Sequence, residues 1–218
     1  MMTIKVITTE DGSKSLFLPQ MNETYHSKYG AWTESEHVFI KAGYQHINLP
    51  EIKILEIGFG TGLNVLLTWL QQLQDGKSIY FETLEKYPLK AEVTDQINAF
   101  SSLEVQQKFK AIHRAEWQQK VSLSEDFVLF KNQTDLTAYQ TDTHFDLIYF
   151  DAFAPDKQPE MWTAAIFEKM YNCLSKGGVL VTYSAKGSVR RTMQAAGFRV
   201  ERLPGPPHKR EMLRAVKE

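Results

Sequence analysis

Cysteine is almost absent from this 218-residue chain, and Cys173 is its single example. One cysteine cannot form an internal disulfide or a cysteine-rich metal site, so we expect no metal, and a buried thiol in a helix-like stretch. Long hydrophobic runs are missing too, because no window approaches ~18 consecutive apolar residues, which predicts no membrane span. The opening MMTIKVITTEDGSKS lacks the apolar core of a secretion signal. These absences favour a cytoplasmic protein.

A net charge of one sign is also lacking, since the formal charge is −1. The distribution is uneven, however. Residues 176–218 hold ten Lys or Arg and three acids, a net +7, which leaves −8 for residues 1–175. A basic end suits a polyanion such as nucleic acid. Charge alone favours the plainer alternative, in which these residues form a solvated surface.

The chain does have a regular alternation of apolar strands and amphipathic helices after Pro50. Before that point the sequence is polar and aromatic without a clear period, so we treat residues 1–50 as an N-terminal extension that packs near the active site. We expect strands at 52–57, 79–84, 127–130, 145–150, 179–183, 198–202 and 211–216. Helices are expected at 62–73, 88–100, 103–109, 161–174 and 189–196. Pro88 suits the first turn of its helix, and Gly177-Gly178 suits a helix end.

This alternation predicts an α/β protein with a Rossmann-like, mainly parallel seven-stranded sheet, helices on both faces and a C-terminal antiparallel hairpin. Sheets of this kind bind ligands at the carboxyl ends of their strands. Three segments fall at that edge: the glycine-rich turn after residue 57, the end of the second strand, and the residue that follows the strand 145–150.

The glycine-rich turn reads Glu56-Ile57-Gly58-Phe59-Gly60-Thr61-Gly62-Leu63-Asn64. Glycines between a strand and a helix let the backbone approach a ligand closely. A dinucleotide loop would place its last glycine at Leu63, so the pattern departs from G-x-G-x-x-G. A carboxylate at Glu56 repels pyrophosphate but suits an ammonium group. We therefore predict an S-adenosylmethionine site formed by Glu56, Gly58, Gly60, Gly62 and Asn64, with a turn that serves only packing as the alternative.

Two further positions are candidates for the nucleoside part of this ligand. Glu85 follows the second strand, where an acid can accept both ribose hydroxyls. Asn132 follows the third strand, where an amide can bond the adenine amino group. Asp126 and Asp135 compete with Asn132, and a solvated loop remains an alternative there.

The sharpest motif is the strand 145–150 followed by Asp151-Ala152-Phe153-Ala154-Pro155. Asp151 should lie at the sheet edge facing the donor. A primary amine has a solution pKa near ~10 and binds mostly as ammonium. A carboxylate beside it attracts it, orients it and can take its proton, which makes Asp151 the candidate catalytic base. The alternative is a turn acid or helix cap.

Five separated stretches resemble the methyltransferase domain of the MnmC family, whose fused enzyme completes 5-methylaminomethyl-2-thiouridine at the tRNA wobble position. They are EIGFGTGLN, LEKYPL, YFDAFAPDKQPEMWT, SAKGSVRRTMQAAGF and GPPHKREM, in the family's order. The resemblance covers roughly residues 25–216, including Tyr25-His26-Ser27 and Glu34–Phe39.

The resemblance implies a class I methyltransferase domain over residues 51–218, with S-adenosylmethionine as donor. It also implies the aminomethyl nitrogen of a modified uridine, in a tRNA anticodon stem-loop, as acceptor. By position, Glu56 and the three loop glycines would line the methionine part, Glu85 would bind ribose and Asp151 would face the amine. The polyanionic substrate directs attention to the basic residues of the C-terminal third, namely Lys186, Arg190, Arg191, Lys209 and Arg210.

The sequence departs from the fused enzyme at two points. Lys131-Asn132 stands where the family has Gly-Asp, which leaves the adenine contact open. The chain also ends at Glu218 without room for a flavin oxidase. We therefore expect a stand-alone methyltransferase without FAD, restricted to the aminomethyl form unless a separate flavin oxidase acts upstream.

Two other functions compete with this interpretation. An aminopropyl transferase of the spermidine synthase type uses a similar glycine loop but needs several acids to hold a diamine, and the C-terminal third has few acids. A non-catalytic RNA-binding module would tolerate a degenerate glycine loop or the loss of the acid at position 151, and neither is seen.

Overall fold

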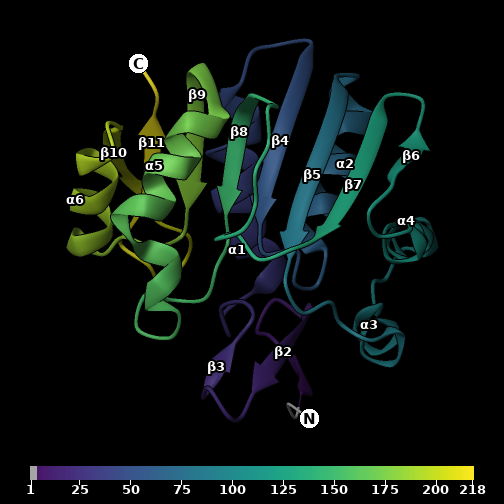
Figure 1. Cartoon of the computed structure of the whole chain (residues 1–218). Coiled ribbons are helices and arrows are strands. Elements are labelled where there is room, and N and C mark those ends of the chain that lie inside the picture. Colours follow the sequence, from purple (N-terminus) through teal and green to yellow (C-terminus); the bar gives the residue numbers. More distant parts are fainter. Residues whose placement is uncertain (1–3) are drawn as a thin grey trace.

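A mixed β-sheet forms the centre of the protein (Figure 1), whose computed structural model describes residues 4–218. In the described residues the sheet contains β4 (Glu51–Ile57), β5 (Ser78–Glu85), β6 (Lys120–Ser124), β7 (Phe127–Gln133), β8 (Phe145–Phe150), β9 (Leu174–Thr182), β10 (Arg199–Pro204) and β11 (Glu211–Val216). The strand order is β10-β11-β9-β8-β4-β5-β7-β6. Pairings among β7, β5, β4, β8 and β9 are parallel, and those of β6, β10 and β11 are antiparallel.

The predicted mainly parallel sheet with a C-terminal antiparallel hairpin is thus confirmed. The sheet has eight strands instead of seven, because β6 pairs with β7 at the edge. Its sequence, KVSLS, is polar and only partly buried, so it gives no apolar run. A strand at the edge of a sheet, with one face exposed to solvent, can form without such a run.

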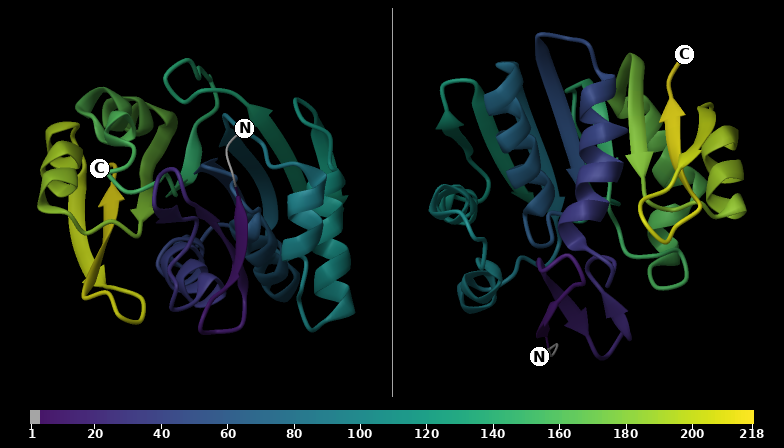
Figure 2. Two further views of the ribbon diagram at one scale, coloured as in Figure 1. Left: turned by 90° about the horizontal axis from the view of Figure 1, so that it is seen from below. Right: turned by 180° about the vertical axis from the view of Figure 1, so that it is seen from behind.

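Helices cover both faces of the sheet (Figure 2). On one face α2 (Leu63–Asp75) packs on Ile54 and Leu147, and on the other α5 (Ala164–Cys173) and α6 (Gly187–Ala195) pack on Leu55 and Ile148. Successive strand residues point to opposite faces, which is why neighbours in one strand serve two cores. Two further helices follow β5: α4 (Leu103–Arg114) lies beside β7 in Figure 1, and α3 (Ala91–Ile97) lies below it, on the side of the small N-terminal sheet.

Two predicted helix ends are wrong. Gly177 and Gly178 do not end a helix, because α5 stops at Cys173 and both glycines lie inside β9. There the N–H of Gly177 donates to the carbonyl of Lys217, and the N–H of Lys217 donates to the carbonyl of Gly178. Pro88 is also outside its helix, since α3 begins at Ala91.

The N-terminal segment, residues 4–50, shares the core of the central sheet through Phe39 and Tyr44, and residues 1–3 lie outside the described part. It contains β1 (Lys5–Thr8), β2 (Lys14–Leu18), β3 (Glu23–Thr24), α1 (Ala31–Ser35), the π-helix η1 (Glu36–Lys41) and the 3-10 turn η2 (Tyr44–His46). The small β1–β3 sheet lies below the carboxyl ends of the central strands (Figure 1). In residues 4–218, no helix is both long and apolar enough to cross a membrane.

Candidate functional site

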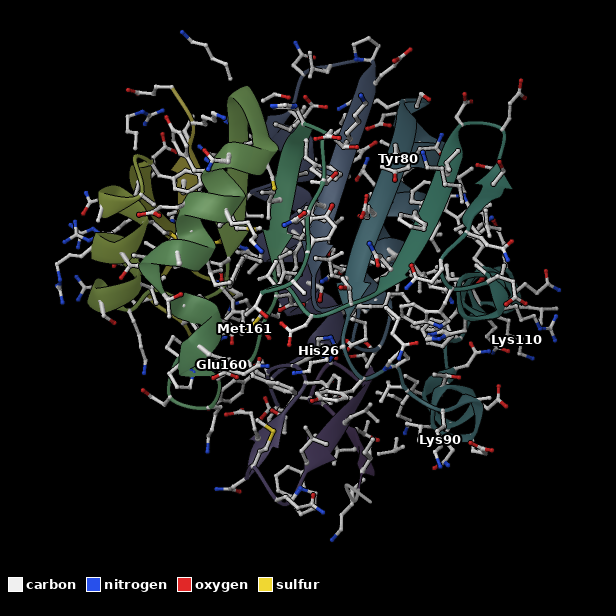
Figure 3. All side chains as sticks on the ribbon, viewed as in Figure 1. His26, Tyr80, Lys90, Lys110, Glu160 and Met161 are labelled. Carbon is white, nitrogen blue, oxygen red and sulfur yellow. The ribbon has the colours of Figure 1, made fainter. Side chains whose placement is uncertain are left out.

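A cavity of about 540 Å³ opens at the carboxyl edge of the central strands. Its walls come from the glycine loop, the ends of β5 and β8, and the N-terminal segment. His26, Glu160 and Met161 all line it, and Figure 3 shows His26 between the strand ends and the small N-terminal sheet. This is the position at which parallel α/β sheets bind their ligands.

The glycine loop needs its glycines for two physical reasons. Gly58, Gly60 and Gly62 have φ of 96°, 49° and 75°, a region that side chains with a Cβ rarely adopt. A Cβ at Gly58 would stand 2.8 Å from the backbone oxygen of Asp151, so glycine lets the loop touch the end of β8. Gly58 and Gly60 line the cavity, whereas Gly62 is the N-cap of α2 and faces Phe59.

Glu85 ends β5 and lines the cavity beside the loop. Its carboxylate accepts hydrogen bonds from the backbone N–H of Gly60 at 3.1 Å and of Tyr87 at 2.8 Å. These bonds hold the side chain at the rim and tie the loop to the second strand. A carboxylate held in this way can still accept hydroxyl donors from a ligand.

Besides Gly62, two of the residues predicted to bind the donor do not line the cavity. Glu56 is fully buried beneath the loop, where its Oε2 accepts from the Thr83 hydroxyl at 2.6 Å. Burial raises the pKa of Glu56 well above its usual range, and nearby Asp151 adds to the rise. The neutral carboxyl is therefore favoured. Asn132 points to Glu82, donating to its Oε1 at 3.2 Å.

Asp151 lies at the end of β8 and lines the cavity. Its backbone N–H donates to the carbonyl of Ile57 at 3.0 Å, and its Oδ2 accepts from Asn64 Nδ2 at 2.9 Å. Burial raises the pKa of Asp151 to about 7; the Asn64 hydrogen bond lowers it, Glu34 raises it further and Lys209 lowers it. A carboxyl with a pKa near neutrality can both take up and release a proton at physiological pH.

Three residues outside the predicted set complete this wall. His26 lies between the hydroxyls of Ser15, at 3.0 Å, and Thr61, at 3.5 Å, and burial lowers its pKa to about 4. Glu34 of α1 forms an ion pair with Lys209, and Tyr183 follows β9. His26 and Glu34 come from stretches without periodicity. Their only sequence signal is that both fall inside the family resemblance.

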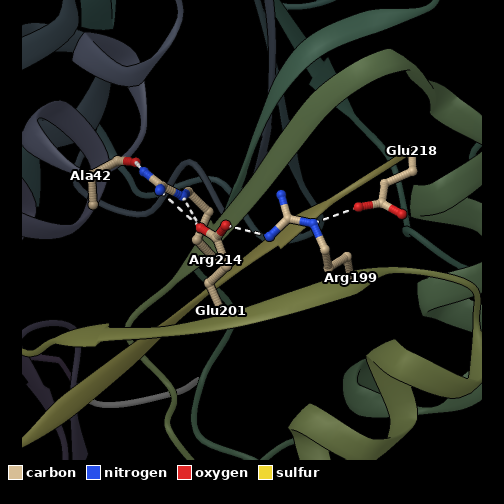
Figure 4. Close-up of polar contacts among 5 residues, drawn as sticks. All are labelled: Ala42, Arg199, Glu201, Arg214 and Glu218. Carbon is tan, nitrogen blue, oxygen red and sulfur yellow. Dashed lines mark hydrogen bonds and ion pairs between the residues drawn. The ribbon is translucent and has the colours of Figure 1, made fainter.

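The predicted basic residues lie in different surroundings. Lys209 lines the cavity, and Lys186 forms an exposed ion pair with Asp156. Arg191 and Arg210 are exposed and Arg190 is half-buried. Several neighbouring cations are engaged elsewhere: Arg214 bonds Glu201 and the carbonyl of Ala42, and Arg199 joins Glu201 to Glu218 (Figure 4).

No group of three or more His, Cys, Asp or Glu side chains suited to a metal ion occurs in the part of the chain that the structure describes. The cavity has instead a glycine cradle, a carboxylate at the end of the second strand and an acid after β8. Glycines let the cradle approach a ligand closely, and the carboxylates suit ribose hydroxyls and cations rather than phosphate. Fold and site together fit a protein that binds S-adenosylmethionine.

Comparison with known proteins identifies the family. A family model described as S-adenosyl-L-methionine-dependent methyltransferase matches residues 92–218, more than half of the chain. The chain belongs to this family.

Curated relatives carry the name tRNA 5-methylaminomethyl-2-thiouridine biosynthesis bifunctional protein MnmC. The chain is 32% identical to that of Leptospira interrogans over 209 residues, covering 89% of this chain and 32% of the relative. It is 33% identical to that of Pseudomonas fluorescens over 211 residues, covering 88% and 32%. The chain therefore spans about a third of the length of these relatives.

Solved structures agree on the fold. The crystal structure of MNMC2 from Aquifex aeolicus matches with a TM-score of 0.80 and 26% identity, covering 99% of this chain and 71% of that one. Spermidine synthase from Thermotoga maritima matches with a TM-score of 0.60 and 14% identity, covering 99% and 68%. The second likeness shows the fold alone.

Proposed function

We propose that this protein methylates the aminomethyl nitrogen of 5-aminomethyl-2-thiouridine at the tRNA wobble position, giving 5-methylaminomethyl-2-thiouridine. The names of the relatives support the substrate. The observation that carries the proposal is Asp151, a carboxyl with a pKa raised to about 7 at the wall of the donor cavity. A base of this strength suits an amine that arrives protonated.

In this proposal the donor lies across the glycine loop. Gly58 and Gly60 let the backbone approach its methionine part closely, and Asn64 lies beside that part. Glu85 accepts hydrogen bonds from the ribose hydroxyls. For adenine we favour the turn 134–137, which lines the cavity, over Asn132, which bonds Glu82. Glu56 supports the site from beneath.

The donor supplies an electrophilic methyl group on a sulfonium, so the protein must present a neutral amine in line with it. Asp151 binds the acceptor as ammonium and takes its proton, which frees the nitrogen lone pair. Asn64 holds the Asp151 carboxylate in position for that transfer. Residues of the N-terminal segment form one wall of the cavity, next to these groups.

Partners follow from the proposed substrate. We infer that an anticodon stem-loop docks over the cavity mouth, with Lys186, Arg190, Arg191 and Arg210 as candidate phosphate contacts, and that the reaction takes place in the cytoplasm. The aminomethyl group must be produced first, and oxidative removal of a carboxymethyl group by a flavin oxidase is one source.

Nucleoside mass spectrometry tests the proposal. Purified protein, S-adenosylmethionine and tRNA carrying 5-aminomethyl-2-thiouridine should give a product heavier by one methylene, confined to that nucleoside. A parallel assay with putrescine and decarboxylated S-adenosylmethionine, whose sulfonium carries the aminopropyl group, addresses the aminopropyl transferase alternative. Methylation absent from tRNA under conditions where the donor binds would reject the proposed substrate.

A further inference from the structure

The ion pair between Glu34 and Lys209 shares the cavity wall with Asp151, although the two residues lie far apart in the sequence. We propose that Glu34 and Lys209 are positioning residues that together set the charge state in which Asp151 meets the acceptor amine. This inference rests on the proposed function. It gives the N-terminal segment a role in the chemistry beyond closing the cavity.

The pair is held from several sides. Glu34 is only 8% exposed, and its Oε2 accepts from the backbone N–H of Ser27 at 2.7 Å. Its Oε1 accepts from Lys209 Nζ, which lies 4.5 Å from the centre of the Tyr183 ring. Tyr183 in turn donates to the carbonyl of Ala152, next to Asp151, at 2.9 Å. Exposed ion pairs contribute little, but this one is partly buried and anchored on both partners.

Two contacts fasten the loop that carries Lys209 to the N-terminal segment. The ring of His37 bonds the carbonyl of Pro204 through Nε2 at 2.9 Å. Tyr29 stacks on His208 with ring centres 3.9 Å apart. The loop between β10 and β11 is thereby fixed against α1 and η1, so the ammonium of Lys209 has a defined place beside the cavity.

Of the charged side chains that line the cavity, Glu34 and Lys209 are the two that shift the pKa of Asp151. Glu85 accepts from the backbone N–H groups of Gly60 and Tyr87, and burial lowers the pKa of His26 to about 4, so its ring is neutral near pH 7. Asn64 of α2 is neutral, Glu56 of β4 is favoured in its neutral form, and burial raises the pKa of Tyr183 well above its usual range, so its phenol keeps its proton. Glu34 and Lys209 remain, and they act in opposite directions: the first favours protonated Asp151 and the second favours the carboxylate.

The reaction needs both influences. The ammonium of the acceptor gives a proton to the Asp151 carboxylate, and the freed lone pair forms the new N–C bond as the C–S bond of the sulfonium breaks, leaving a thioether. The product nitrogen then carries the positive charge. Lys209 keeps Asp151 ionised and disfavours a protonated amine before transfer, while Glu34 balances the cation so that a charged acceptor enters and a charged product forms.

The test is the pH dependence of single-turnover methylation with saturating donor. Lys209→Met should move the acidic limb of the profile up by about 1 pH unit, because it removes the cation that favours ionised Asp151. Glu34→Gln should move it down by a similar amount. The double variant should lie close to wild type, and Lys209→Arg, which keeps the charge, should restore the wild-type limb.

Lys41→Met is the matched control, because Lys41 forms an exposed ion pair with Glu36 away from the cavity. It should leave the limb in place. Equal loss of rate at all pH values in Glu34→Gln and Lys209→Met, with an unmoved limb, would show a merely structural pair and overturn the inference; limbs that move in the same direction would do so too. A wild-type protein that methylates no tRNA would instead reject the proposed function.

Discussion

Asn64 holds Asp151 by a hydrogen bond of 2.9 Å from Nδ2 to Oδ2, joining the first turn of α2 to the end of β8. On the other side of the amide, Asn64 Oδ1 is buried and has no partner among the described residues, and the same is true of Glu56 Oε1. Asn64 is close enough to Glu56 to lower the pKa of its carboxyl. We infer that a protonated Glu56 can satisfy both unpartnered oxygens, because a carboxyl O–H can donate to an amide oxygen.

This arrangement predicts that Glu56 works as a neutral group. Glu56→Gln should keep donor affinity and turnover within about twofold, because an amide can donate to Asn64 Oδ1 and accept from Thr83. Glu56→Leu should lower turnover about tenfold or more, since a buried hydrogen bond worth about 1–3 kcal/mol is lost and Asn64 is released. Calorimetry and steady-state kinetics decide. A large loss of donor affinity in Glu56→Gln would mean that the Glu56 charge binds the donor.

Asp151 is expected to act as the proton acceptor. Asp151→Asn keeps the size and removes the basicity, so turnover should fall on the order of 10²–10⁴-fold with donor affinity near wild type. In the wild-type protein, protonated Asp151 cannot accept a proton, so the rate should rise with pH through about 7. Near-normal turnover in Asp151→Asn would make Asp151 a turn residue and water the proton acceptor.

Much of this fold was predictable because strand and helix periodicity is local. The strands 145–150 and 211–216 have the predicted bounds. The N-terminal sheet and β6 were not predicted, because short polar strands depend on partners that only the tertiary structure supplies. Gly177-Gly178 resembled the end of a helix in the sequence, but both glycines lie inside the strand β9.

The site was predictable in part for the same reason. The strand-end positions of Glu85 and Asp151 follow from the predicted sheet. The direction of a side chain does not follow from it, and the sequence therefore did not predict that Glu56 points beneath the loop. Lys131 is another example: it is 1% exposed and bonds the carbonyls of Ile112 and His113, at the end of α4, at 3.0 Å each. The Glu34–Lys209 pair joins two irregular segments that no periodicity connects.

Glu85 is expected to bind the ribose of the donor. Glu85→Ala removes the acceptor for the ribose hydroxyls and frees the N–H of Gly60, so donor binding should weaken by about 1–3 kcal/mol. Calorimetric titration with S-adenosylmethionine measures this directly. Glu92→Ala, an exposed acid on α3, is the control and should bind normally. Unchanged donor affinity in Glu85→Ala would remove the ribose assignment.

Binding of tRNA should depend on salt and on the basic residues Arg190, Arg191 and Arg210. Each phosphate contact that is lost should lower the slope of log K against log salt by about 1. Arg210 adjoins the cavity-lining Lys209, so Arg210→Ala should weaken tRNA binding more than the Arg190→Ala/Arg191→Ala double variant. Filter binding across a salt series measures both effects, with donor affinity as the check on folding. Wild-type slopes in all variants would place the contact surface elsewhere.

The most direct test of the account combines wild-type and Asp151→Asn protein in one assay. Both are given labelled S-adenosylmethionine and tRNA carrying 5-aminomethyl-2-thiouridine, and the digested nucleosides are analysed by mass spectrometry. The account predicts labelled 5-methylaminomethyl-2-thiouridine with the wild type and almost none with Asp151→Asn, at equal donor affinity. Label in a different nucleoside, or equal yields from the two proteins, would contradict it.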